Sequence, residues 1–253
     1  MNFDLQEPRK QAARGGRLFS HLWSARSAFW VLRVGVVCGW GLLSGGCATR
    51  EVTPKVRDTS RSFTTVVLDA GHGAHDSGAR IRKGPLEKDL ALDVVLRMEP
   101  KLRAAGFRTV LTRRRDVFIP LLQRAEISNA QTNAIFVSVH FNDAGRRSAC
   151  GVESYYFSPE SSRMASRMVG ALSQGTGAPN RCARAARFCV LRNNANPAVL
   201  MECGYLSSRA EAALIVQPGY RERIAAGIVR GIVEQRGGPL LQKAETLSAF
   251  ALQ

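Results

Sequence analysis

Apolar blocks separated by polar stretches predict alternating strands and helices from about residue 64 to residue 236. Short apolar runs rich in β-branched residues are typical of buried strands, and longer amphipathic stretches are typical of helices. The expected strands cover 64–69, 107–112, 133–140, 151–157, 187–192 and 197–204. The expected helices cover 87–106, 120–131, 159–175, 207–215 and 218–238.

Residues that favour helix ends support these limits. Ser208 and Glu211 have the spacing of a capping box, and Pro218 and Gly237 stand where a last helix should begin and end. Pro100 falls inside an expected helix and should kink or restart it. Strands alternating with helices in this way predict a single α/β domain, whose mostly parallel sheet carries helices on both faces.

Three of the expected strands end in, or just before, a side chain that can bind a metal or a proton. His72 follows the first strand, His140 ends a central one, and Glu202 lies in a late apolar one. Ligands of open α/β sheets bind at the carboxyl edge of the strands, so these side chains should converge there. Glu87 opens the first helix, after a loop that can fold back over the same edge.

Two histidines and a glutamate form one of the common ligand sets of catalytic zinc, which leave one position for water. A further carboxylate outside the metal shell can then act as general base. Sequence spacing alone leaves ordinary alternatives open, because no HExxH motif is present. His72 could be a loop histidine, His140 a buried histidine with a hydrogen-bond partner, and Glu87 a carboxylate at a helix N-terminus.

Other polar residues near these positions have less specific interpretations. We expect Asp69 to orient the first histidine or its loop, and His75 to be a loop residue rather than a fourth ligand. Asn142 and Arg192 are candidate substrate contacts, with surface solvation as the alternative. The arginines at 113–115 should form a solvated turn.

The N-terminal segment is typical of a targeting signal. Residues 34–47, VGVVCGWGLLSGGC, are apolar, follow two arginines, and are too short to span a bilayer comfortably. The ending LSGGC resembles a bacterial lipoprotein signal, although Ser44 stands where an aliphatic residue is usual. We therefore expect a signal peptide at 1–47 that ends at a lipidated Cys47. An uncleaved anchor and ordinary secretion are the alternatives.

The remaining segments and the charge complete the expected organisation. A flexible linker is expected at 48–62, the catalytic domain at 63–237 and a tail at 238–253. The net charge is +16, of which about +12 lies beyond the signal, and such an excess favours anionic partners. No basic motif with interleaved aromatic residues is present, so we expect a wall polymer or an anionic lipid and no nucleic acid.

Cysteine usage bears on the compartment. Four cysteines lie beyond the signal, and an exported protein can form disulfides among them. Cys182 and Cys189 flank a short basic segment and are the first candidates for a pair, whereas Cys203 lies in an apolar run and should be a buried thiol. A cysteine zinc site is not expected, because no CxxC spacing occurs.

Several motifs together resemble the zinc-dependent N-acetylmuramoyl-L-alanine amidases of the amidase-3 family. They are, in order, VVLDAGHGAHDSGA, EKDLALDV, GFRTVLTRRRDVFIPLLQRAEISN, AIFVSVHFN, GVESYYFS and VLRNNANPAVLMECGYLSS, and they span about residues 64–236. The resemblance implies a twisted sheet between helices. It also implies that His72, Glu87 and His140 bind Zn²⁺ and that Glu202 is the catalytic residue.

The resemblance further implies that the protein hydrolyses the amide between N-acetylmuramic acid and L-alanine in peptidoglycan, for wall remodelling, cell separation or turnover. Phe141 stands at a usually small position, so we expect a narrower rim of the site. Cys203 replaces the usual apolar neighbour of the catalytic glutamate. Some family members carry a helical insertion after the strand equivalent to 151–157 that blocks the zinc, and this chain has no room for one there.

Two other functions remain as alternatives, a zinc peptidase acting on muropeptides and a non-catalytic peptidoglycan-binding lipoprotein. The expected partners are peptidoglycan and a membrane, which the chain would reach through lipidated Cys47, and the protein should be a monomer. Ala48, rather than Asp, after the lipidated cysteine favours the periplasmic face of the outer membrane. Secretion to the periplasm is the alternative if Cys47 is not lipidated.

Overall fold

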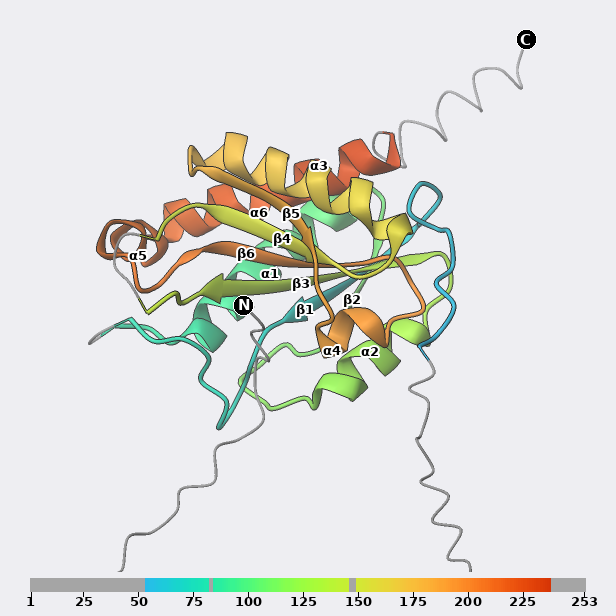
Figure 1. Cartoon of the computed structure of the whole chain (residues 1–253), viewed down its shortest axis with the longest axis horizontal. Helices are drawn as coiled ribbons and strands as arrows, with labels where there is room; N and C mark the ends of the chain where they lie inside the picture. Colours follow the sequence, from blue (N-terminus) through green and yellow to red (C-terminus); the bar gives the residue numbers. More distant parts are fainter. Residues whose placement is uncertain (1–52, 82–83, 146–148, 238–253) are drawn as a thin grey trace, which may run out of the picture. The chain divides into compact units, whose positions relative to one another are not determined.

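The chain folds around a six-stranded sheet in the order β2-β1-β3-β6-β4-β5 (Figure 1). A computed structural model describes residues 53–81, 84–145 and 149–237. The strands are β1 (Thr65–Ala70), β2 (Arg108–Leu111), β3 (Ala134–Asn142), β4 (Val152–Tyr156), β5 (Asn180–Ala185) and β6 (Ala198–Tyr205). All neighbouring strands are parallel except β4 and β6, which are antiparallel. The predicted α/β class with a mostly parallel sheet is confirmed.

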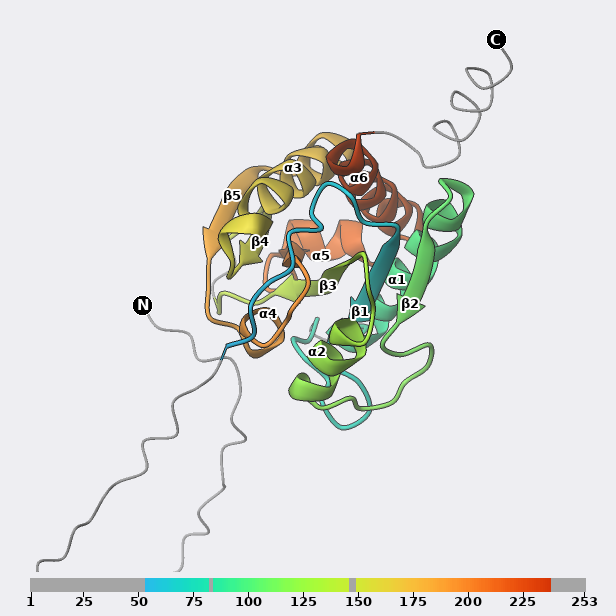
Figure 2. The same cartoon turned by 90° about the vertical axis from the view of Figure 1, so that its right-hand side faces the viewer.

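Helices cover both faces of the sheet, as Figure 2 shows. They are α1 (Glu87–Ala104), α2 (Leu121–Asn129), α3 (Pro159–Thr176), α4 (Cys189–Arg192), α5 (Arg209–Ile215) and α6 (Pro218–Arg236). The long helices α1, α3 and α6 pack on one face over the larger apolar core, and α2 and α4 pack on the other over a smaller one.

The sheet face under α2 and α4 is apolar at the amino ends of β3 and β6 and polar toward their carboxyl ends. At their amino ends, Phe136 of β3 and Leu200 of β6 belong to the smaller apolar core. Side chains alternate between faces along a strand, so the next inward positions on this face are Ser138 and His140 of β3 and Glu202 of β6. The carboxyl half of this face is therefore polar, and it carries His140 and Glu202, two of the candidate site residues predicted from the sequence.

Two strand predictions need correction. The expected strand at 187–192 is wrong, because residues 189–192 form α4, whose Val190 and Leu191 fill the smaller core. The observed strand β5 was missed because its residues, NRCARA, are polar and largely exposed. Strand β5 is at the edge of the sheet and most of its side chains face solvent, so its sequence needs no apolar run.

Helix ends follow the sequence signals more closely. The Ser208 side chain caps α5 by accepting from the Glu211 backbone N–H, and Gly237 ends α6 with a φ of 86°. Helix α1, however, runs through Pro100 without restarting. Pro100 has no backbone N–H, so the carbonyl of Leu96 lacks its usual helical hydrogen bond. Both residues are exposed, so water can donate to that carbonyl instead.

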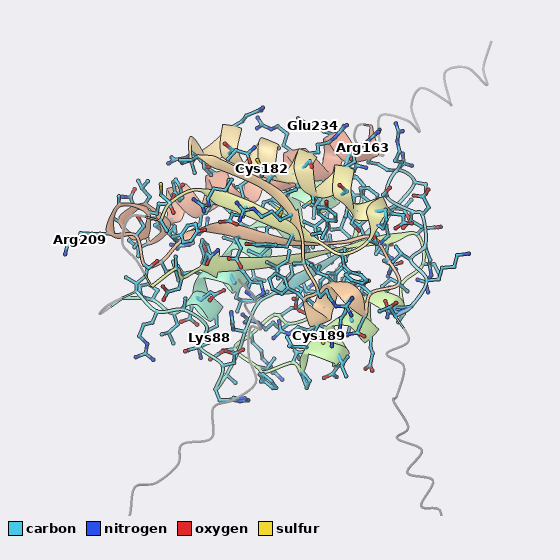
Figure 3. All side chains as sticks on the ribbon, viewed as in Figure 1. Lys88, Arg163, Cys182, Cys189, Arg209 and Glu234 are labelled. Atoms are coloured by element: carbon cyan, nitrogen blue, oxygen red, sulfur yellow. The ribbon has the colours of Figure 1, made fainter. Side chains whose placement is uncertain are left out.

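Predictions about the linker, a disulfide and the two ends of the chain can also be compared with the structure. Part of the expected linker at 48–62 is docked: the Arg57 backbone N–H donates to the carbonyl of Ala195 at 2.8 Å, and the Thr59 hydroxyl donates to that of Ala134 at 2.7 Å. The disulfide predicted between Cys182 and Cys189 is wrong, because both are free thiols in different parts of the domain (Figure 3). The expected signal peptide at 1–47 and tail at 238–253 lie outside the described residues.

The part of the chain that the structure describes contains no helix with the length and apolar character to cross a membrane.

Helices α3 and α6 pack so closely that Gly231 has no room for a side chain. A Cβ at Gly231 would lie 2.7 Å from the Met168 Cα, whereas one at Gly170 would meet nothing within 4 Å. We expect Gly231→Ala to lower the free energy of unfolding by about 1–3 kcal/mol through overpacking. Gly170→Ala, the matched control in α3, should raise it by about 0.5–1 kcal/mol. Urea unfolding checks both, and equal effects would contradict the close packing.

Candidate metal centre

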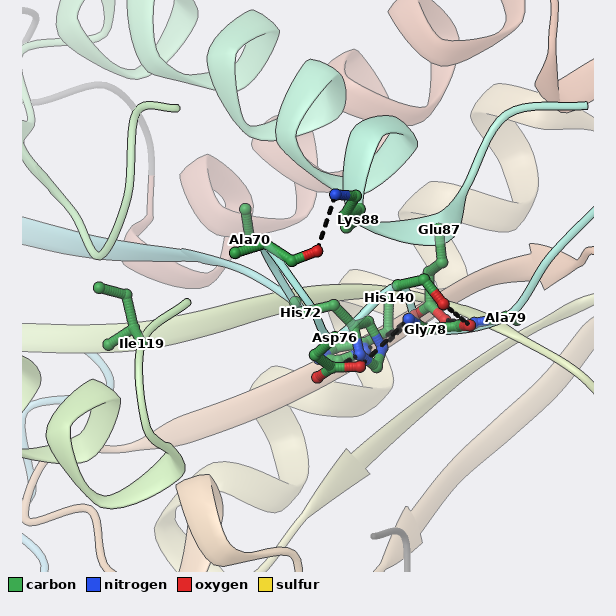
Figure 4. A network of polar contacts seen from close by, with 12 residues as sticks. Ala70, His72, Asp76, Gly78, Ala79, Glu87, Lys88, Ile119 and His140 are labelled. Carbon is green, nitrogen blue, oxygen red and sulfur yellow. Dashed lines mark hydrogen bonds and ion pairs between the residues drawn. The ribbon is translucent and has the colours of Figure 1, made fainter. Parts of the chain in front are cut away.

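Three side chains from three separate elements meet at the carboxyl edge of the sheet (Figure 4). The Oε1 atom of Glu87, the first residue of α1, lies 3.0 Å from His72 Nε2 and 3.0 Å from His140 Nδ1. One ligand atom from each residue lies within 4.8 Å of the others. A His₂Glu set with this spacing fits one divalent cation bound at the roughly 2.0–2.2 Å typical of zinc. The structure thus brings together the three ligands predicted from the sequence.

The His72 ring is oriented by a carboxylate from its own loop. His72 Nδ1 donates to Asp76 Oδ2 at 2.9 Å, which leaves Nε2 directed at the site. A metal-binding histidine commonly donates its other ring N–H in this way. Asp76 therefore orients the His72 ring from within the same loop.

Backbone donors fix the Glu87 carboxylate on both of its oxygens. The Ala79 N–H donates to Oε2 at 2.7 Å and the Phe141 N–H donates to Oε1 at 3.0 Å. Burial disfavours the charged form, but hydrogen bonds from His140 and His72 hold the pKa of Glu87 well below its usual range. The carboxylate is ionised, as a metal ligand must be.

The pKa of His72 is shifted in the opposite sense. Burial disfavours the imidazolium, but hydrogen bonds to Asp76 and Glu87 raise the pKa of His72 to about 9. Without a metal, His72 is therefore protonated at neutral pH and is held between two carboxylates.

Gly71 allows the two histidine-bearing segments to approach each other. A Cβ at Gly71 would lie 2.3–2.6 Å from three atoms of the His140 ring. The His72 and His140 ring centroids are 4.9 Å apart at an interplanar angle of 77°. Any side chain at Gly71 would displace a ligand, which accounts for the glycine before His72.

A buried ion pair lies beneath the loop that carries His72. Arg124, which is 2% exposed, donates to Asp69 Oδ1 at 2.8 Å and to the carbonyls of Ala70 and His72 at 2.7 Å each. Asp69 accepts further hydrogen bonds from Thr112 and Ser138. Asp69 thus supports the loop through Arg124.

Arg113 holds the same loop from a second side. It donates to the carbonyl of Ala70 at 2.9 Å, and to those of Gly71 and Lys88 at 2.7 Å each. The side chain is buried, so the predicted solvated turn at 113–115 is wrong for Arg113. Sequence reasoning missed this role because three adjacent arginines look alike until the fold selects one of them.

Glu202 lies next to the three ligands on the polar half of the sheet face. It is the β6 residue directly opposite His140 of β3, and it is 6% exposed. Its Oε2 atom is buried without a hydrogen-bond partner among the described residues. Burial, reinforced by the negative charges of Glu87 and Glu153, raises the pKa of Glu202 well above its usual value.

A third carboxylate, which sequence reasoning did not single out, continues this row. Glu153 of β4 is the residue opposite Glu202 of β6 and is 1% exposed. Burial disfavours its charge, but hydrogen bonds from Tyr205, Tyr155 and Arg181 hold the pKa of Glu153 below its usual value. The signal in the sequence was a glutamate at an inward position of the alternating strand GVESYYF.

A model of the N-acetylmuramoyl-L-alanine amidase family matches residues 66–234. The chain belongs to this family.

Named relatives support the assignment. The chain is 33% identical over 173 residues to the N-acetylmuramoyl-L-alanine amidase LytC of Bacillus subtilis, covering 67% of this chain and 35% of that protein. It is 36% identical over 178 residues to an endolysin of Bacillus phage SPP1, covering 67% of this chain and 65% of the endolysin. The chain thus spans about a third of LytC and less than two thirds of the endolysin.

Two solved amidase structures are matched along nearly their whole length. The catalytic domain of the amidase CwlV from Bacillus (Paenibacillus) polymyxa var. colistinus is 37% identical, with a TM-score of 0.64, and 68% of this chain covers 97% of that chain. The amidase AmiC2 of Nostoc punctiforme is also 37% identical, with a TM-score of 0.64, and the match covers 67% of this chain and 95% of AmiC2. These similarities agree with a single α/β domain.

Other residues predicted from the sequence take different places in this amidase fold. His75 packs on Phe118, with ring centroids 4.3 Å apart, and is not among the three clustered ligands. Phe141 is buried in the larger core, so the expectation that it narrows the rim is wrong. Cys203 is a buried free thiol, as predicted. Asn142 ends β3, and Arg192 ends α4 with its guanidinium donating to the carbonyl of Arg187 at 3.5 Å.

Removing Arg124 should destabilise the amidase strongly. Arg124→Met leaves Asp69 as an uncompensated buried charge, so we expect the free energy of unfolding to fall by about 3–5 kcal/mol. The exposed Arg209→Met, in α5, should change it by less than about 0.5 kcal/mol. Adding Asp69→Asn to Arg124→Met should recover part of the loss. Urea unfolding measures all three, and a loss below about 1 kcal/mol for Arg124→Met would contradict the role of the ion pair.

Metal binding should release a proton from His72. The pKa of about 9 means that an ion must displace that proton at neutral pH, so apparent Zn²⁺ affinity should rise about tenfold per pH unit from 6 to 8. Asp76→Asn removes one of the two carboxylates that raise the pKa of His72, so the dependence of Zn²⁺ affinity on pH should become weaker. Competition with a chelator at several pH values measures it, and equal affinity at pH 6 and pH 8 would contradict the prediction.

Proposed function

We propose that this protein is a zinc-dependent amidase that hydrolyses the bond between N-acetylmuramic acid and L-alanine in peptidoglycan. The observation that carries the proposal is the position of Glu202. Glu202 is a buried carboxylate, one oxygen of which has no hydrogen-bond partner among the described residues, and it lies on the strand next to His140, directly opposite that proposed ligand. Membership of the amidase family adds the substrate class.

The residues of the chain have distinct roles in the proposed reaction. His72, Glu87 and His140 would hold Zn²⁺, which when bound polarises the scissile carbonyl and activates water at neutral pH. Glu202 accepts the proton of the attacking water and delivers it to the departing amine of L-alanine. Its raised pKa suits the protonated half of this cycle, in which the carboxyl group must hold and then donate the proton.

The path of the chain after β4 supports an open site. Strand β4 ends at Tyr156 and α3 begins at Pro159, so no helical insertion separates them. Helix α3 then packs against α6 on the face of the sheet opposite Glu202. We therefore expect activity without an added activator.

The expected cellular role and location are part of the proposal. The amidase would act in wall remodelling, cell separation or turnover, as a monomer anchored by lipidated Cys47 to the periplasmic face of the outer membrane. The positive net charge suits an anionic wall. Mass spectrometry of the mature N-terminus tests the anchor, because acylation adds a defined mass to a peptide that begins with Cys47.

Two alternatives give different products or none. A muropeptide peptidase would cleave within the stem peptide, and a non-catalytic wall-binding protein would cleave nothing. The clustered His₂Glu set together with buried Glu202 favours a catalyst over a binding protein. Fold similarity alone would not separate these functions.

Digestion of purified muropeptides tests the proposal. The protein should release new L-alanine amino termini, and a chelator should abolish the release until Zn²⁺ is restored. Glu202→Ala should lower kcat by roughly 10²–10⁴-fold with unchanged metal content, because it removes the proton-transfer group. The exposed Glu126→Ala is the matched control and should keep full activity. New amino termini only from within the stem would favour the peptidase, and wild-type rates for Glu202→Ala would exclude it as the base.

A further inference from the structure

On the strand next to Glu202, the buried carboxylate of Glu153 accepts hydrogen bonds from two arginines and two tyrosines. Its Oε1 atom accepts from Arg181 Nε at 2.6 Å and from the Tyr205 hydroxyl. Its Oε2 atom accepts from the Tyr155 hydroxyl at 2.8 Å and from Arg184 Nη1 at 3.4 Å. The Glu153 side chain is only 2% exposed, so the centre of this cluster is buried inside the domain.

The cluster carries one positive charge more than its carboxylate can neutralise. Arg181 and Arg184 share the single charge of Glu153, and among the described residues neither has another carboxylate within 4 Å. The Arg184 side chain is 53% exposed and that of Arg181 is 34% exposed. A guanidinium group with spare donors and access to solvent is suited to bind a carboxylate from outside the chain.

The spacing of the strands limits how far the two arginines lie from β6, which carries Glu202. Glu153 is directly opposite Glu202, and neighbouring strands are about 4.8 Å apart, so β4 lies about 5 Å and β5 about 10 Å from β6. Because both arginines reach back from β5 to Glu153, their guanidinium groups lie between these limits. In the stem peptide, the α-carboxylate of the residue after L-alanine is roughly 5–7 Å from the scissile nitrogen.

We propose that Arg184, held with Arg181 by Glu153, binds the free α-carboxylate of the second stem-peptide residue. The amidase then prefers acidic stems over stems in which this carboxylate is amidated. A neutral amide cannot accept the paired N–H donors as a carboxylate does, so the arginine would be left partly unpaired. This inference rests on the proposed amidase function and adds a specificity to it.

Two substrates that differ in one group test the proposal, N-acetylmuramoyl-L-alanyl-D-isoglutamate and its isoglutamine counterpart. We expect kcat/KM for the acid to exceed that for the amide at least tenfold, mostly through KM. Arg184→Gln should bring this ratio close to one, and Arg184→Lys should restore part of it. The exposed Arg209→Gln lowers the net charge equally and should keep the wild-type ratio.

A fourth variant separates positioning from simple charge. Glu153→Gln removes the group that holds both arginines, so the acid-to-amide ratio should fall while bound metal and thermal stability are followed alongside. A merely structural role would lower the rates on both substrates together and leave the ratio unchanged. That result would overturn the positioning role of Glu153.

The outcomes also separate this inference from the proposed function. Equal kcat/KM on acid and amide for the wild type, or an unchanged ratio in Arg184→Gln, overturns the carboxylate subsite and leaves the amidase function intact. If neither dipeptide is cleaved, the same comparison is made with full-length stems with and without the amidation. No cleavage of any muramoyl–L-alanine bond would overturn the amidase function itself.

Discussion

Asp69 and Arg124 form an ion pair in the interior of the domain, directly beneath the loop that carries His72. Such a pair is costly to desolvate and is retained only where further hydrogen bonds compensate it. Here Thr112 and Ser138 complete the carboxylate, and backbone carbonyls of the loop complete the guanidinium. Arg124 thus holds a loop whose His72 has a left-handed φ of 60°, a conformation that needs external support. The candidate metal centre depends on this support, because a side chain that moves by a fraction of an ångström no longer meets the other residues of the site.

Much of the fold could be predicted because it rests on strong local signals, whereas the candidate ligand set was predicted from a family resemblance, because spacing alone left other interpretations of each residue open. Buried parallel strands require continuous apolar runs, and the carboxyl edge of such a sheet collects His72, His140 and Glu202 whatever the details. Strand β5 could not be predicted, since an exposed edge strand imposes no apolar pattern. The burial of Arg113 was also out of reach, because it depends on how the loop folds in three dimensions.

The polar row across β3, β6 and β4 follows from strand pairing. Residues opposite each other share a face, so the register that places His140 beside Glu202 also places Glu202 beside Glu153. Several ionisable groups are therefore confined to one buried strip, and each needs its own source of stabilisation. Glu153 has two tyrosines and two arginines, whereas Glu202 has one oxygen without a partner among the described residues.

This difference in partners sets the protonation of the carboxylates. Glu87 is surrounded by donors and keeps its charge, while Glu202, equally buried, faces the charges of Glu87 and Glu153 and favours its neutral form. Two carboxylates whose pKa values are pushed apart can take different roles, one as a permanent anion and one as a group that gains and loses a proton. The surroundings of Glu87 therefore suit the proposed metal ligand, and those of Glu202 suit a group that holds a proton and then donates it, in agreement with the roles proposed for them.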